Sequence, residues 1–322
     1  MSAILTEPEM PSVAHYEDQY LALMRTIWRD GVHRGDRTGT GTRALFGANM
    51  RFSLADGAVP LLTTKRVYWK TAAREMLWFL SGDTNIRPLV EQKVHIWTDW
   101  PLAKYRAATG EDIDRDAFEA RIIADAGFAT QWGDLGPVYG KQWVDWPVYD
   151  PAPEAGEGLY RRRQHGINQI ADLVTSLRDN PGSRRHIFEG WNVAELDRMA
   201  LPPCHKTYQF FVAEGQLTCL LYQRSCDVAL GVPFNIFSAA LLTHMLAQQC
   251  GLAPGELIWN GGDVHLYENH ESLVTEQLSR TPSGYPRLEI ARRASDIFGY
   301  RIEDFVVHDY TPQAHIAAPV AV

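Results

Sequence analysis

The spacing of apolar residues along the chain predicts four helices. Residues 15–30 have the pattern of an amphipathic helix that ends before Gly31, and 65–80, KRVYWKTAAREMLWFL, also carry apolar side chains at helical spacing. Another helix is predicted over 166–179, just before the turn sequence NPGS. The segment 235–251, NIFSAALLTHMLAQQCG, is apolar on most faces, which is typical of a helix at the centre of a fold.

Strands are predicted between and after these helices. Residues 186–192, 206–213 and 217–224 are rich in β-branched and aromatic side chains, and AEGQ joins the last two as a hairpin. The segment ALFGANMRFSL, 44–54, is predicted to be an edge strand that follows a loop rich in Gly and Thr. Two stretches are predicted to be surface insertions: 101–130 as a polar, helical one and 147–163 as a loop.

Composition and charge narrow the class of protein. The 322 residues are 45% hydrophobic and 22% charged, which suits a globular protein with one large core or two modest ones. No apolar run is long enough for a membrane span, and the N-terminus lacks the features of a secretory signal. Four cysteines without a CxxC pair predict neither a disulfide framework nor a metal site, so a cytoplasmic location is expected.

The net charge of −8 argues against a protein dedicated to nucleic-acid binding. An anionic ligand therefore requires a local group of arginines. Such groups occur around Arg37 in DRTGTGTR, at Arg184 and Arg185 in PGSRRH, and at Arg224 in YQRSCD. Each one alone is typical of a solvated surface charge. Together, near predicted turns and strand ends, they indicate an anion site.

Two further residues are candidates for chemistry. Cys204 follows Pro202 and Pro203, whose fixed φ stiffens the approach to the predicted strand over 206–213. Such a position suits a nucleophile, and it equally suits a small buried residue. Glu75 lies at the border of the apolar stripe of 65–80. Its carboxylate is either turned outward or held in a site that raises its pKa.

A series of motifs occurs in the order known from one enzyme family. From about residue 16 to residue 322 the chain resembles thymidylate synthases, which leaves 1–15 as a tail. The resemblance implies one α/β (α+β) domain with a large, mostly antiparallel or mixed sheet flanked by helices. The outer face of that sheet would form the interface of a homodimer. The motifs that carry the resemblance are DRTGTGT, LLTTKR, EMLWFLSGDTNI, HIWTDW, GDLGPVYGKQW, SRRHIFEGWN, MALPPCH, YQRSCDVALGVPFN, GGDVHLYENH and a terminal APVAV.

The resemblance implies reductive methylation of dUMP to dTMP. The co-substrate would be 5,10-methylenetetrahydrofolate, which supplies the one-carbon unit and the hydride and leaves as dihydrofolate. Cys204 matches the nucleophile that adds to C6 of the pyrimidine. Because the thiolate is the reactive form, we expect cationic neighbours, Arg224 first, to lower the pKa of Cys204. Glu75 matches the glutamate that mediates proton transfers, and further members of its polar network match Tyr139, His205 and Asp227.

The same matching assigns the nucleotide site. A phosphate carries close to two negative charges and suits several guanidinium groups. Arg37 and Arg224 would come from one subunit and Arg184 and Arg185 from its partner. The remaining matches are Ser225 at the phosphate, Asn235 as the reader of the pyrimidine edge, and His265 and Tyr267 at the sugar hydroxyl.

The folate site is assigned in the same way. The folate-facing wall matches Ile96, Trp97, Trp100, Gly231 and Phe234. Asp227 would contact the pterin ring, Lys65 the polyglutamate tail, and the carboxylate of Val322 would help to close the site over both ligands.

The chain departs from the usual family motifs at a few positions. It has EGWN at 189–192 where SAWN is usual, NIFSAALL where NIASYALL is usual, and an altered C-terminal tail. These departures keep open a deoxyuridylate hydroxymethylase, in which water rather than hydride captures the intermediate. Trp97 favours the synthase, and Asn235 argues against a deoxycytidylate enzyme. A non-catalytic nucleotide- or RNA-binding homologue would be expected to lack Cys204, Glu75 or an arginine, and none is missing.

Overall fold

The computed structural model of the chain describes residues 15–35 and 39–319 and has a six-stranded sheet at its centre. The order of its strands is β1 (Val32–Arg34), β2 (Thr42–Ser53), β8 (Ala253–Tyr267), β7 (Gln216–Asp227), β6 (His205–Ala213) and β5 (Ile187–Glu189). Strands β7 and β8 are parallel, and all other neighbours are antiparallel. The predicted α/β fold with a mixed sheet is confirmed.

The predicted hairpin of β6 and β7 is confirmed, whereas β8, a central strand of the sheet, was not predicted. The β6–β7 turn, Glu214-Gly215, has positive φ at both residues, which matches the twist of a tight hairpin. Strand β2 is an edge only in part, because β1 pairs with its first residues. The 15-residue β8 was not predicted. Its Pro254 and several glycines are residues that count against a strand.

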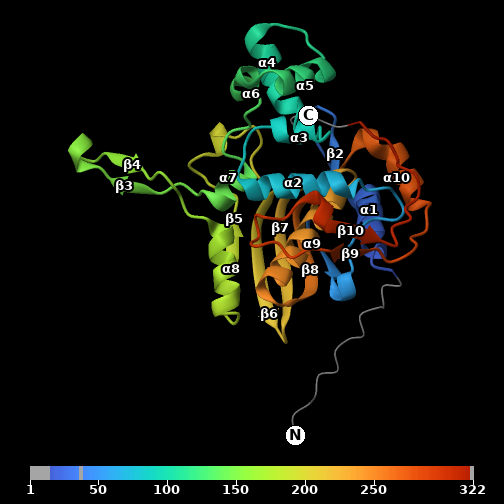
Figure 1. Cartoon of the computed structure of the whole chain (residues 1–322). Helices are drawn as coiled ribbons and strands as arrows, with labels where there is room; N and C mark the ends of the chain where they lie inside the picture. The colour runs from blue at the N-terminus through green and yellow to red at the C-terminus, as the bar shows by residue number, and fades with distance from the viewer. Residues whose placement is uncertain (1–14, 36–38, 320–322) are drawn as a thin grey trace.

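The predicted helices are present with shifted ends. They are α1 (Asp18–Asp30), α2 (Trp69–Ser81), α8 (Gln169–Asp179) and α9 (Gly231–Cys250). Helix α9 is buried over most of its length and packs on β7 and β8, as its apolar sequence predicts. It lies with α2 on one face of the sheet (Figure 1). Because α2 begins at Trp69, Lys65 belongs to the segment that precedes the helix.

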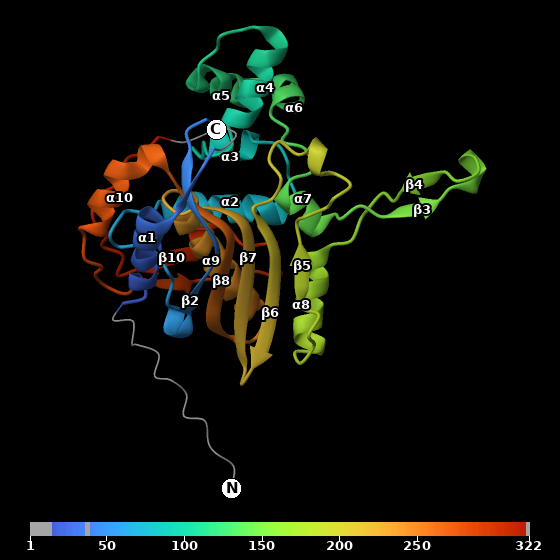
Figure 2. The same cartoon turned by 180° about the vertical axis from the view of Figure 1, so that it is seen from behind.

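The opposite face of the sheet has no helix over β6 and β7 in the view from behind (Figure 2). Residues that alternate outward on β5, β6 and β7 include the large apolar side chains of Ile187, Phe211 and Tyr222, which are exposed. Three large apolar side chains are thus exposed on a face of these strands that no helix covers in Figure 2.

The first surface insertion is helical, as predicted, and the second is more ordered than predicted. The first forms α4 (Asp99–Thr109), α5 (Arg115–Ala124) and α6 (Ala126–Trp132), with a small core of Tyr105, Phe118, Ile122 and Phe128. The second is a hairpin of β3 (Tyr149–Pro151) and β4 (Tyr160–Arg162), not a loop. It projects from the body of the molecule in both views (Figures 1 and 2). The remaining elements are α3 (Arg87–Glu91), α7 (Tyr139–Val144), α10 (Glu271–Leu278), β9 (Arg287–Ile290) and β10 (Phe305–His308).

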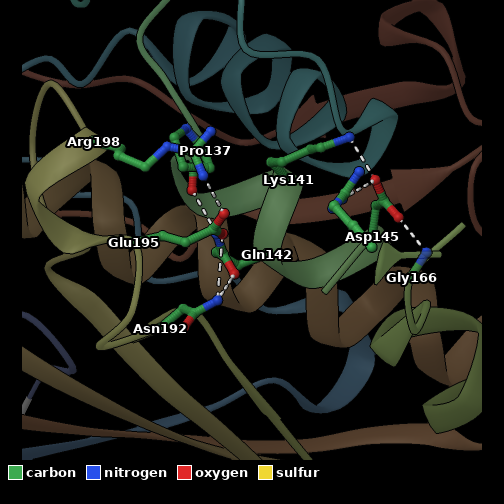
Figure 3. Close-up of polar contacts among 9 residues, drawn as sticks. Pro137, Lys141, Gln142, Asp145, Gly166, Asn192, Glu195 and Arg198 are labelled. Carbon is green, nitrogen blue, oxygen red and sulfur yellow. Dashed lines mark hydrogen bonds and ion pairs between the residues drawn. The ribbon is translucent and has the colours of Figure 1, made fainter. Parts of the chain in front are cut away.

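A buried polar network joins α7 to the loop that leads to Cys204 (Figure 3). The amide of Gln142 donates to Glu195 (2.8 Å) and accepts from Asn192 (3.0 Å). Arg198 closes the network with a bond to the other oxygen of Glu195 (2.7 Å). Buried polar groups are costly unless they are all bonded, so this set specifies one position of the loop 192–198 relative to α7.

Helix α7 also lies very close to α2, because Gly140 has no side chain. A Cβ at Gly140 would lie 2.0 Å from the carbonyl oxygen of Phe79 on α2. That atom is backbone and cannot turn away, so the two helices would have to separate.

We therefore expect Gly140→Ala to lower the free energy of unfolding by about 1–3 kcal/mol, as overpacked cores do. The measurement is urea denaturation followed by circular dichroism. Gly182→Ala is the control, because a Cβ at Gly182 meets no atom within 4 Å. Equal stabilities of the two variants would contradict the close packing of α7 on α2.

Candidate active site

A cavity of about 760 Å³ lies where β6, β7 and β8 meet the start of α9. Helix α2 and the segment 95–100 close its other sides. Most of the residues predicted for the site line this one cavity: Lys65, Glu75, Ile96, Trp97, Trp100, Tyr139, Cys204, His205, Arg224, Ser225, Asp227, Gly231, Phe234, Asn235, His265 and Tyr267.

Two of the predicted residues, Arg184 and Arg185, are not among those that line this cavity. Arg184 and Arg185 lie on the loop between α8 and β5, where both are exposed, and neither lines the cavity. They have no ion pair within the part of the chain that the structure describes. Arg37 and Val322 lie outside the described residues.

Cys204 is held on both sides of its backbone, just before β6. Its N–H donates to the hydroxyl of Tyr139 (2.7 Å), and its carbonyl accepts from the N–H of Arg224 (2.9 Å). The guanidinium of Arg224 donates to the carbonyls of Pro203 (2.9 Å) and Pro202 (2.7 Å). The two prolines thus orient the arginine next to the thiol, as well as stiffening the chain.

The expectation that the pKa of Cys204 is lowered is wrong. Burial raises the pKa of the thiol above its ordinary value, and the positive charge of Arg224 offsets only part of that rise. His205 adds no charge, because burial lowers the pKa of its imidazole to about 4. At neutral pH the side chains of Cys204 and His205 are therefore mainly uncharged.

Glu75 is turned inward, which decides between the two possibilities left by its sequence position. The side chain is buried, and its Oε1 accepts a hydrogen bond from Nε1 of Trp97 (2.7 Å). Burial raises the pKa of Glu75 to about 7, although the bond from Trp97 acts in the opposite direction. A carboxyl with this pKa can both donate and accept a proton near neutrality.

Asn235 is oriented by a residue that the sequence analysis missed. The indole of Trp259 donates to Oε1 of Gln223 (2.9 Å), so the amide nitrogen of Gln223 faces Oδ1 of Asn235 and donates to it (2.8 Å). This leaves the amide N–H groups of Asn235 for other partners. Gln223 lies within the quoted motif YQRSCD, and its amide next to a predicted strand end is the signal that could have found it.

The β8 side of the cavity carries a second polar group. Nδ1 of His265 lies 3.0 Å from Oδ1 of Asp263, whose other oxygen pairs with Arg34 (2.5 Å). The imidazole ring of His265 packs edge to face against the phenol ring of Tyr267, with 5.4 Å between the ring centroids. These contacts fix the orientation of His265 without using its Nε2, which is the nitrogen available to a ligand.

Lys65 and Asp227 lie together at the start of α9. The ammonium of Lys65 donates to the carbonyl of Ala229, while Oδ1 of Asp227 accepts from the N–H groups of Ala229 (3.0 Å) and Leu230 (3.1 Å). Burial lowers the pKa of Lys65 to about 8, and the charge of Asp227 opposes this shift. Lys65 is thus more enclosed than a residue at an open rim.

An aromatic wall faces this end of the cavity. Trp97 lies 5.3 Å from Trp100 and 5.7 Å from Tyr139, measured between ring centroids. Further lining residues that the sequence analysis missed come from 95–99, from α5 and from the C-terminal segment: His95, Asp99, Arg115 and His315.

Two properties of the described residues bear on the class of protein. Over 15–35 and 39–319, no group of three or more His, Cys, Asp or Glu side chains is arranged to hold a metal ion. Within the same ranges, no helix has the length and apolar character needed to cross a membrane.

The sequence matches one family over most of its length. The sequence model of the thymidylate synthase family aligns with residues 18–322. The chain is 69% identical to a thymidylate synthase of Novosphingobium aromaticivorans over 308 residues, which covers 96% of this chain and 97% of that protein. It is 70% identical to one of Sphingopyxis alaskensis (97% and 100% covered) and 57% identical to one of Cereibacter sphaeroides (96% and 100% covered). With its predicted catalytic residues gathered in one cavity, the chain belongs to the thymidylate synthase family.

Proposed function

We propose that the cavity converts dUMP to dTMP with 5,10-methylenetetrahydrofolate, with Cys204 as the nucleophile. The enzyme class is that of the family, a methyltransferase that forms dTMP. One observation carries the assignment of the site: Cys204, Glu75, Arg224 and Asn235 come from four separate segments and line the same cavity. The relatives are named thymidylate synthases, which does not favour the hydroxymethylase alternative.

The nucleotide phosphate is bound by arginines of two subunits in this proposal. Arg224 and Ser225 line the cavity. Arg37, which lies outside the described residues, would join them. The partner subunit's Arg184 and the partner subunit's Arg185 complete the group. Their exposure and lack of ion pairs among the described residues support this role, as does the uncovered apolar face of the sheet. The unit of function would be a homodimer whose interface includes that face.

The base and the sugar are read by the polar groups deeper in the cavity. The amide nitrogen of Asn235, oriented by Gln223, donates to O4 of uracil, and Oδ1 has a second lone pair for the N3–H. Nε2 of His265, together with Tyr267, binds the sugar hydroxyl. A cytosine would present an amino group where Asn235 also presents one, and the site would then leave donors unpaired.

The walls of the cavity fit a folate. Trp97, Trp100 and Phe234 offer flat apolar surface for a pterin and an aryl ring, with Gly231 and Ile96 beside them, and Asp227 is the polar group for the pterin edge. Lys65, with Arg115 near the same cavity, suits the acidic tail of that co-substrate. When bound, the folate supplies the one-carbon unit and the hydride. The C-terminal Val322 would help to exclude water from the closed site.

Proton transfer is the task of the buried groups around Glu75. Because the Cys204 thiol is mainly protonated, addition to C6 requires that its proton be removed. Arg224 stabilises the thiolate as it forms, the Tyr139 hydroxyl accepts from the backbone N–H of Cys204, and His205 is an uncharged neighbour. Glu75, with a pKa of about 7, can carry protons to and from the pyrimidine.

The remaining parts of the proposal concern the whole chain. Residues 16–322 form the catalytic domain after a tail, 1–15, and 101–130 and 147–163 are its insertions. The protein acts in the cytoplasm.

The first test is product analysis with a nucleophile variant. Wild-type protein with dUMP and methylenetetrahydrofolate should give dTMP by mass and dihydrofolate by absorbance. Cys204→Ser should lower the rate at least about 10³-fold, because a hydroxyl has a much higher pKa than a thiol. Its affinity for dUMP should stay within about threefold. Cys250→Ser, at the far end of α9, is the control and should remain active. Hydroxymethyl-dUMP without dihydrofolate would instead establish the hydroxymethylase.

The raised pKa of Glu75 predicts a specific dependence of stability on pH. Between the ordinary value of 4.5 and about 7, the folded chain holds a proton on Glu75 that the unfolded chain has lost. This group therefore makes the protein less stable as pH rises through that window, and the effect is constant above it. Glu75→Gln cannot ionise, so its stability relative to wild type should rise by about 3 kcal/mol between pH 4.5 and 7.

Urea denaturation at a series of pH values measures this difference. Glu157→Gln, at an exposed position on the projecting hairpin, is the matched control and should show no such rise. A stability difference that stays constant from pH 4.5 to 8 would mean that Glu75 is not held with a raised pKa.

The shared site predicts rescue between two inactive subunits. Cys204→Ser and the double variant Arg184→Ala/Arg185→Ala should each be inactive. In a heterodimer one site receives both defects and the other receives none, so equal mixing should restore about a quarter of wild-type activity after subunit exchange. If the arginines served their own subunit, each site would keep one defect and mixing would restore nothing.

A further inference from the structure

The helical insertion contains a buried carboxylate that the proposed chemistry does not use. Glu119 lies on α5, and its side chain is only 7% exposed. Buried carboxylates are rare unless they are paired, because removing the charge from water is costly. The partners of Glu119 therefore indicate what the residue does.

Both oxygens of Glu119 bind the wall of the cavity, outside the insertion. Oε2 lies 2.6 Å from Nδ1 of His95, which must be the donor because a carboxylate only accepts. Oε1 accepts from the hydroxyl of Thr98. The two donors flank Trp97 in the sequence: His95 lies two residues before it and Thr98 one residue after it. One carboxylate thus binds a side chain on each side of this tryptophan.

Trp97 connects this anchor to the proton-transfer group. Its indole N–H donates to Glu75 (2.7 Å), and its ring forms part of the aromatic wall. A shift of the segment 95–98 would change both the bond to Glu75 and the surface offered to the folate. Displacements as small as about 1 Å can cost about 100-fold in rate.

A second tie joins the same helix to the same segment. Arg115, at the start of α5, binds Asp99 through Nη2, at 2.7 and 2.9 Å from the two carboxylate oxygens. Both side chains line the cavity. Helix α5 is therefore attached to 95–99 at two places one turn apart, and its other face packs in the small core of the insertion around Phe118.

We propose that Glu119 is a positioning residue, which holds Trp97 in place for its contacts with Glu75 and the folate. Through Glu119, the insertion 101–130 then keeps the segment 95–98 of the cavity wall in position for catalysis. We call this contact of Glu119 with His95 and Thr98 the brace. This inference rests on the proposed function, since it concerns the same reaction.

The test combines Glu119→Gln with Trp97→Phe in a double-mutant cycle. A glutamine keeps the size of the side chain, yet its NH₂ group faces one of the two donors and cannot accept from it. We expect Glu119→Gln to lower kcat for dTMP formation about 10-fold or more, with the Kd of dUMP within about twofold. In the Trp97→Phe background the same change should cost less than about twofold, because the two residues act as one unit.

Asp116→Asn is the matched control on the same helix. Asp116 is exposed, three residues before Glu119, and has no hydrogen bond or ion pair among the described residues. Its kcat should equal that of wild type. A Glu119→Asp variant, which retains the charge, should recover part of the loss.

Hydrogen–deuterium exchange of the isolated proteins gives a readout that does not require turnover. Glu119→Gln should raise exchange in peptides that cover 95–98 and leave those of β6 and β7 unchanged. Faster exchange in 95–98 together with a wild-type protein that makes no dTMP would overturn the proposed function but not the brace.

Three results would overturn the brace itself. The first is unchanged exchange over 95–98, and the second is a kcat equal to that of Asp116→Asn. The third is a loss of the same size with and without Trp97, which would mean that Glu119 acts on the fold as a whole.

Discussion

The site depends above all on the contact between Arg224 and the carbonyls of Pro202 and Pro203. This contact joins the end of β7 to the turn before β6, so the thiol of Cys204 and the guanidinium are placed by the same bonds. The backbone bond from Arg224 to Cys204 adds a third link. The carbonyls accept as those of any residue would, and the fixed φ of the two prolines restricts where these carbonyls can point. The guanidinium of Arg224 and the thiol of Cys204 are therefore held near each other by contacts within the protein.

Burial disfavours the charged form of four titratable side chains that line the cavity. It raises the pKa of Cys204 and of Glu75, and it lowers that of His205 and of Lys65. Neighbours of opposite charge correct these shifts only in part. At neutral pH the Cys204 thiol and the His205 imidazole are therefore mainly uncharged, and Glu75 changes its charge near pH 7. Such a site needs little free energy to keep ions away from water. Glu75, whose pKa is about 7, is suited to proton transfer near neutral pH.

Local patterns in the sequence were enough for much of the fold, and the resemblance to thymidylate synthases supplied most of the residues proposed for the site. The β6–β7 hairpin and helix α9 follow from turn chemistry and from apolar runs, which depend on near neighbours in the chain. Strand β8 could not be recognised, because its glycines and Pro254 hide a strand that only its neighbours β2 and β7 stabilise. The sign of the Cys204 shift was also missed, since a motif shows which charges are near and not how much water is lost.

The insertion 101–130 is a second case in which sequence patterns predict the elements and not their contacts. Its polar, alanine-rich sequence indicated surface helices, and α4, α5 and α6 are indeed present. The attachment of α5 to the cavity wall depends on Glu119 meeting residues more than twenty positions earlier, which no periodicity reports. A segment whose sequence predicts only surface helices can thus contact the wall of the cavity. The reason is physical: the wall segment 95–99 lies outside the sheet and α9, and it needs support from whatever element packs on its outer side.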